Sequence, residues 1–162
     1  MRKWLRLLPP LCWMLLIFLF SAAPAVESTE QSTGITGMIV DMVGHFIPID
    51  SAGRLQMIAF LEPYVRKAAH MTEFGVLFLL WIGPVRARFS NMTKAVAIAA
   101  GICTVYAASD EYHQLFVPGR SGMVTDVCID IFGVLLAAIV CLLSEIKKER
   151  RASRSPSGSS NS

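Results

Sequence analysis

The sequence predicts an all-α membrane protein, a bundle of four transmembrane helices with a long outer loop between helices 1 and 2. Of its 162 residues, 54% are apolar and 17% are charged, whereas soluble domains carry about 25% charged residues. The mean hydropathy is +0.53, and four apolar runs each approach the ~20 residues with which a helix crosses the membrane. This composition excludes a disordered protein and argues against a soluble globular enzyme.

The first span, residues 7–26, follows a basic start. An alternative remains open here, because a basic start, an apolar middle and an Ala-Pro-Ala sequence also fit a secretory signal peptide. Cleavage would leave three spans without changing the orientation of the rest. Residues 27–67 are rich in Ser, Thr, Gly and acids. We expect an outer loop there, with an amphipathic surface helix at 53–67.

The remaining spans are predicted at 66–83, 94–113 and 124–144. The second and third reach full length only when their polar ends are counted. Unpaired backbone groups are not tolerated in hydrocarbon, so each span is expected to be a helix. Residues 84–94 form a short basic inner turn. The tail 147–162 is basic and then Ser-rich, and we expect it to be disordered.

The placement of Lys and Arg predicts the orientation, because cytoplasmic segments carry an excess of both. With the N-terminus inside, 11 of the 15 basic residues lie in cytoplasmic segments and 4 in outer ones. The opposite topology inverts this ratio. We therefore predict a multi-pass protein of the cell membrane with both termini in the cytoplasm.

Composition also limits the partners. The net charge of +3 is too small and too divided to indicate nucleic-acid binding. The four cysteines lie in apolar runs without metal-ligand or disulfide spacing, so we interpret them as small hydrophobic residues. The predicted partner is the lipid bilayer, and no cofactor is expected.

Polar residues gather at one membrane level, the outer-leaflet boundary. Ionisable residues in spans are costly and therefore indicate function. His70 and Glu73 share one face of the second span because they are three residues apart. We expect an outward-facing polar pocket formed by His70, Glu73, Asp110, Glu111, His113, Gln114, Arg120, Asp126 and Asp130.

The fourth span carries a stripe that begins with two acids. Asp126, Asp130, Gly133 and Ala137 follow one another at helical spacing, and the small residues allow a neighbouring helix to pack closely. A structural alternative stays open for the whole cluster of polar residues, in which Arg120 pairs with Asp126 or Glu111, His70 pairs with Glu73, and these buried contacts only lock the helices together.

The expected pocket is compatible with several kinds of chemistry. Crowded carboxylates can hold or pass protons, and with His70 or His113 they are also ligand types for a divalent cation. No metal-ligand spacing is specific, so we predict no metal site. Arg120 is the expected anchor for a phosphate or carboxylate group of a ligand.

These residues resemble the VanZ-like family, small integral-membrane proteins named for teicoplanin resistance. The resemblance rests on the motif SDExxQxFxPGR at residues 109–120 and on the motif DxxxDxxG at residues 126–133. RKxxHxxEF at 66–74 and the Phe-Ser pair at 20–21 support it. The resemblance covers about residues 5–142 and implies a multi-span membrane domain.

The resemblance implies a contribution to teicoplanin resistance or envelope homeostasis, and it supplies no reaction. Glycopeptides act outside the membrane, so an outer pocket lies on the correct side. We expect a non-enzymatic protein that binds a lipid-linked or glycopeptide ligand at the outer leaflet.

Two alternatives remain. One is a membrane enzyme acting on a lipid headgroup or cell-wall precursor pyrophosphate, with Asp110 or Glu111 as general base, a histidine as acid and Arg120 as phosphate clamp. The other is a proton-coupled transporter, which four short spans without an inverted repeat do not favour.

Overall fold

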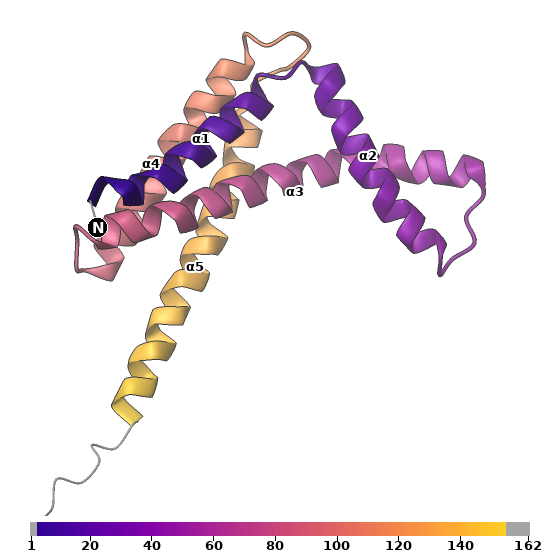
Figure 1. Ribbon diagram of the computed structural model, residues 1–162. Coiled ribbons are helices and arrows are strands. Elements are labelled where there is room, and N and C mark those ends of the chain that lie inside the picture. Colours follow the sequence, from indigo (N-terminus) through magenta and orange to yellow (C-terminus); the bar gives the residue numbers. More distant parts are fainter. Residues whose placement is uncertain (1–2, 155–162) are drawn as a thin grey trace, which may run out of the picture.

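The computed structural model describes residues 3–154 (Figure 1). Its helices are η1 (Lys3–Leu7), α1 (Leu8–Ser21), α2 (Ala25–Gly44), α3 (Ser51–Arg86), α4 (Met92–Gln114) and α5 (Val124–Arg154). Strands are absent from this described part of the chain, which confirms the all-α class. Four helical segments are long and apolar enough to cross a membrane: Trp4–Ser21, Ser51–Arg86, Met92–Gln114 and Val124–Ser153.

The first membrane helix is shorter than the predicted span 7–26, because α1 ends at Ser21. Pro24 adopts an extended backbone with ψ of 154° and is the N-cap of α2. A proline disfavours the helical conformation of the residue before it. The chain therefore turns at residues 22–24 and begins a second helix in a new direction (Figure 1).

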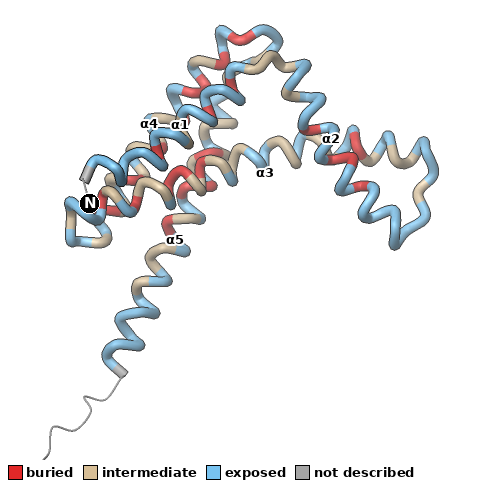
Figure 2. Tube along the Cα trace, viewed as in Figure 1, coloured by how far each residue is buried: buried red, intermediate tan, exposed pale blue. Residues whose placement is uncertain are grey.

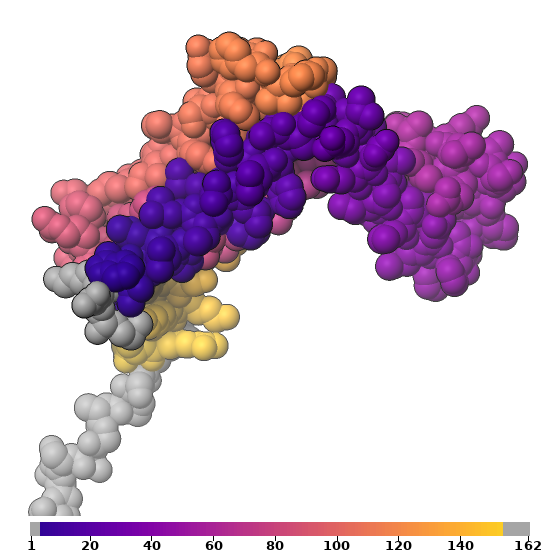
Figure 3. Space-filling model, turned by 45° about the horizontal axis from the view of Figure 1, so that its top comes forward, coloured from indigo at the N-terminus to yellow at the C-terminus, as the bar shows by residue number. Residues whose placement is uncertain are grey.

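The expected outer loop at residues 27–67 is instead a helical hairpin. The loop is wrong where α2 runs, at Ala25–Gly44, whereas the helix expected at 53–67 is present as the beginning of α3. α2 packs against the N-terminal part of α3, and Figure 3 shows the pair as a lobe that stands out from the rest of the molecule. We call residues 25–67 the α2–α3 hairpin. Its hydroxyl side chains bond within their own helix, as Thr36 Oγ1 does by donating to the Ser32 carbonyl at 2.7 Å. A Ser- and Thr-rich composition is therefore compatible with a helix here.

The C-terminal helix is longer than expected. We expected a disordered tail from Lys147, but α5 continues to Arg154. Residues 147–152 contain Lys, Glu, Arg and Ala, all of which have high helix propensity. The rest of the expected tail, residues 155–162, lies outside the described residues.

The core lies where α1, α3, α4 and α5 meet (Figure 2). From α3, Phe74, Leu77 and Phe78 are fully buried. α4 meets this region with small buried residues at four-residue spacing: Ala95, Ala99, Cys103 and Ala107. Because small residues let helix backbones approach closely, this stripe accommodates the aromatic side chains of α3.

The close packing predicted for the acidic stripe is present between α3 and α5. A Cβ atom on Gly133 would lie 2.0 Å from the carbonyl oxygen of Met71, and one on Gly75 would lie 3.3 Å from that of Gly133. Only glycine fits at residue 133 without displacing a helix. This contact fixes Asp130 of α5 beside His70 of α3.

Candidate functional site

Two buried carboxylates join three helices at the level of the expected pocket. Asp110 Oδ2 accepts hydrogen bonds from Ser21 Oγ of α1 at 2.7 Å and from Gln114 Nε2 at 3.0 Å. Glu111 Oε1 accepts from the same Gln114 amide at 3.2 Å, and its Oε2 accepts from the Met123 N–H at 3.0 Å. The acids of α4 therefore hold the end of α1 and the start of α5.

Arg120 is bound mainly to backbone. Its Nε donates to the Ala23 carbonyl at 2.9 Å, one terminal nitrogen donates to the Phe20 carbonyl at 3.0 Å, and the other donates to Gln114 Oε1 at 3.2 Å. The last carbonyls of a helix lack intrahelical partners, so Arg120 supplies donors at the end of α1. Burial lowers the pKa of the Arg120 guanidinium from its ordinary value, and nearby Arg66 acts in the same direction.

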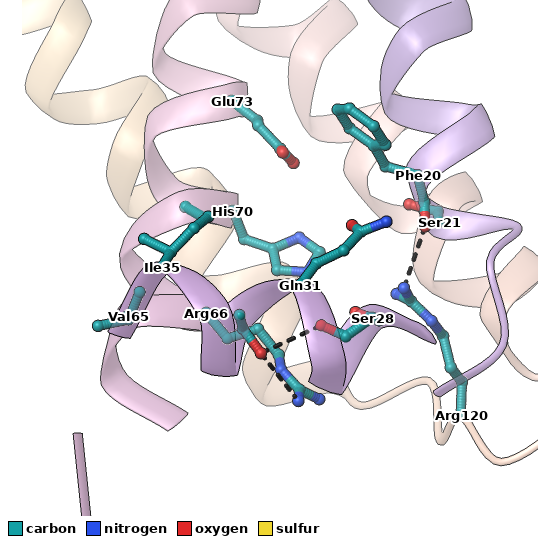
Figure 4. A pocket seen from close by; sticks show the side chains of 12 residues that line it. Phe20, Ser21, Ser28, Gln31, Ile35, Val65, Arg66, His70, Glu73 and Arg120 are labelled. Atoms are coloured by element: carbon teal, nitrogen blue, oxygen red, sulfur yellow. Dashed lines mark hydrogen bonds between the residues drawn. The ribbon is translucent and has the colours of Figure 1, made fainter. Parts of the chain in front are cut away.

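Two adjoining cavities lie beside this network and share Arg66, His70 and Arg120. The first, of ≈ 200 Å³, lies between α1, α2 and α3 and is also lined by Ser21 and Glu73 (Figure 4). The second, of ≈ 300 Å³, has the following further charged or amide side chains in its wall: Glu62, Lys67, Gln114 and Asp126. Both cavities thus contain cations and acids in one continuous wall.

Asp130 lies beside His70 and lines neither cavity. Its side chain is 0% exposed, and its Oδ1 is 3.9 Å from His70 Nδ1, which exceeds hydrogen-bond distance. Among the described residues, neither carboxylate oxygen of Asp130 nor His70 Nδ1 has a hydrogen-bond partner. A buried polar group without a partner costs about 1–3 kcal/mol, so this pair is held in place by the helices.

A family model described as VanZ/LLP1 matches residues 7–145. The chain belongs to the VanZ/LLP1 family. No curated protein and no solved structure matches it. Together with the four candidate spans, family membership identifies a VanZ-like multi-pass membrane protein.

In this VanZ-like chain, the structure brings all the expected pocket residues except His113 to the cavities or directly behind them. His70, Glu73, Gln114, Arg120 and Asp126 line the cavities. Asp110, Glu111 and Asp130 are buried beside them.

His113 faces α1, where its ring centroid lies 4.6 Å from that of Phe18. It lines neither cavity. Its one-residue offset from Gln114 turns it to another side of α4, because successive helical residues point about 100° apart.

The pocket predicted from the sequence did not include Ser21, Glu62 or Arg66. Arg66 donates to Thr29 Oγ1 at 2.9 Å and to Glu62, which also accepts from Ser32 Oγ. Residues 62, 66, 70 and 73 follow one helix face. That spacing was a usable signal, but the segment before residue 66 was expected to lie outside the span.

The chemistry available to these side chains is binding and proton exchange. In the described part of the chain, no group of three or more His, Cys, Asp or Glu side chains is arranged to hold a metal ion. Arginine forks pair well with phosphate and carboxylate groups, and Arg66 and Arg120 both face the cavities.

Proposed function

We propose that this VanZ-like membrane protein binds an envelope component or a glycopeptide in an outward-facing polar pocket, and so contributes to teicoplanin resistance or envelope homeostasis. The observation that carries this proposal is the pair of cavities that share Arg66, His70 and Arg120. A wall of this kind can pair with anionic and hydrogen-bonding groups of a ligand.

The distribution of basic residues supports an outward-facing site. With both termini in the cytoplasm, 11 of 15 Lys and Arg residues lie in cytoplasmic segments. The end of α1 and the start of α3 then lie on the outer side. Cell-wall precursors and glycopeptides meet the protein on that side.

The contacts favour binding over catalysis by the acids of α4. Asp110 and Glu111 accept hydrogen bonds from Ser21, Gln114 and the Met123 N–H. A general base needs a lone pair within reach of the substrate, but these carboxylates hold helices together and line neither cavity.

One observation favours the enzyme as a second candidate. His70 lines both cavities, and its Nδ1 faces Asp130 at 3.9 Å. Such a histidine can exchange protons with a lipid headgroup or a precursor pyrophosphate. Deletion of the gene would then change the lipid profile of the envelope, whereas a binding protein leaves it unchanged.

The test is teicoplanin and vancomycin susceptibility in a deletion strain that carries wild type, His70→Ala or Arg66→Gln. Arg54→Gln is the matched control, because Arg54 lies on the same helix and pairs with Asp41 away from the cavities. Membrane levels of all variants must be equal. We expect wild type and Arg54→Gln to raise the inhibitory concentration of teicoplanin and the two cavity variants to lose that effect. Equal susceptibility with and without the wild-type gene would refute the resistance role.

A further inference from the structure

The first cavity combines a polar floor with an apolar rim. Figure 4 shows Phe20 on one side and Ile35 with Val65 on the opposite side, with His70 and Glu73 between them. A small soluble ion would contact only the polar side chains at the floor of this cavity. A molecule with both a polar head and a hydrocarbon chain matches the whole cavity.

The rim continues into an apolar stripe on α2. Exposed residues at helical spacing form this stripe: Ile35 (54%), Met38 (74%), Ile39 (42%) and Met42 (69%). Phe46 (84%) follows in the turn just after α2. Ser32, Thr36 and Val40 are buried on another face of α2, while Glu30, Thr33 and Asp41 are exposed on the polar side. This division is typical of an amphipathic helix, which has one apolar and one polar side.

The length of α3 places the hairpin at a membrane surface. α3 has 36 residues and is therefore about 54 Å long, whereas the hydrocarbon core is ~30 Å thick. The N-terminal part of α3 that packs on α2 consequently extends beyond the core. The apolar stripe begins beside the end of the first membrane helix, because Phe20 of α1 and Ile35 of α2 line the same cavity.

Arg66 is a cation that faces this site. It lines both cavities, and its side chain is 34% exposed. One of its terminal nitrogens donates to Thr29 Oγ1 and to Glu62, and the planar fork of a guanidinium pairs well with phosphate oxygens. Arg120 and His70 line the same two cavities.

We propose that this site takes a lipid with an anionic, phosphate-type headgroup from the leaflet that holds the α2–α3 hairpin. The headgroup lies against Arg66, and the hydrocarbon chain leaves across Phe20 and Ile35. This inference rests on the proposed function, because it names the ligand class of the same cavity. It adds a direction of entry, sideways from the membrane.

Binding to the purified full-length protein in detergent tests the inference with three probes: dihexanoyl phosphatidic acid, inorganic phosphate and uncharged dihexanoylglycerol. We expect phosphatidic acid to bind at least tenfold more tightly than the other two. Arg66→Gln should weaken it about tenfold through loss of a charge-assisted hydrogen bond. Arg54→Gln should leave it unchanged.

A second pair of variants distinguishes the contribution of the lipid's hydrocarbon chain to binding from that of its headgroup. Ile35→Asn should weaken phosphatidic acid several-fold without affecting inorganic phosphate. Ile39→Asn is its control, since Ile39 belongs to the stripe but does not line the cavity. Both side chains are exposed, so neither change should prevent folding, and unfolding curves verify this.

The outcomes distinguish the inference from the proposed function. Equal affinity for inorganic phosphate and phosphatidic acid, with no effect of Ile35→Asn, would show a site for soluble anions and overturn the lipid inference. Failure of phosphatidic acid to bind would overturn it as well. In either case the proposed function is decided separately, by the teicoplanin response of His70→Ala and Arg66→Gln.

Discussion

The closest helix contact gives a quantitative prediction. Replacing Gly133 by alanine adds a methyl group 2.0 Å from the carbonyl oxygen of Met71, whereas non-bonded carbon atoms prefer about 3.5–4.0 Å. The methyl group meets a backbone atom of α3, and a backbone atom cannot move aside by rotation as a side chain can. α3 and α5 must therefore separate by about 1.5 Å at this level.

The cost follows from two opposing effects. Overpacking of a well-packed core destabilises by about 1–3 kcal/mol, and a backbone clash belongs at the upper end. Alanine regains about 1 kcal/mol of helix propensity relative to glycine. We expect Gly133→Ala to lose about 2 kcal/mol net. Gly101→Ala meets nothing within 4 Å and should gain about 1 kcal/mol.

The assay is SDS-induced unfolding of the purified protein in mixed micelles, followed by tryptophan fluorescence. Gly75→Ala should fall between the other two variants, because its Cβ would lie 3.3 Å from the Gly133 carbonyl oxygen. Gly133→Ala should also disturb the 3.9 Å approach of His70 and Asp130. Equal unfolding curves for Gly133→Ala and Gly101→Ala would refute close packing between α3 and α5.

Three further predictions concern the end of α1 and the hairpin. Arg120→Lys should destabilise the protein by about 1–2 kcal/mol in the same assay, because an ammonium group lacks the planar fork that serves the carbonyls of Phe20 and Ala23 and the Gln114 amide together. In a background in which the three native tryptophans are replaced by phenylalanine, the fluorescence of Met42→Trp should be quenched by brominated acyl chains in liposomes, and that of Thr33→Trp on the polar side of α2 should not. The Arg54 guanidinium holds the pKa of Asp41 below its ordinary value of 3.8, so this ion pair persists above that value and is lost as the pH falls through the lowered pKa of the folded state. A carboxyl-carbon NMR titration in detergent should show this pKa rise in Arg54→Gln.

The membrane helices could be predicted because apolar length is a local property of the sequence. Within the hairpin, the helix at 53–67 could be predicted from its amphipathic pattern, but α2 could not, since its polar residues match a loop in composition. α2 is accompanied by contacts with α3, among them those of Ser32 and Thr29 with Glu62 and Arg66. Such pairing joins residues about 30 or more positions apart in the chain, and composition carries no information about it.

The level of the candidate site could be predicted because topology sends the ends of successive spans to the same depth. The roles within it could not. Arg120 was expected to anchor a ligand, and its partners include the backbone carbonyls of Phe20 and Ala23. Because every residue has a backbone carbonyl, the sequence does not indicate which carbonyls Arg120 contacts. Arg66 was missed because its partner Thr29 lies in the hairpin.

The site lies at the junction of two parts that are held together with different strength. The bundle is fixed by backbone contacts such as that of Gly133 with Met71, whereas the hairpin is tied partly by the exposed ion pair between Arg54 and Asp41. Solvent screening weakens such exposed ion pairs. A ligand that touches Phe20 of α1, Ile35 of α2 and Arg66 of α3 at once connects these parts, so its binding should protect the amides of α2 from hydrogen exchange more than those of α4.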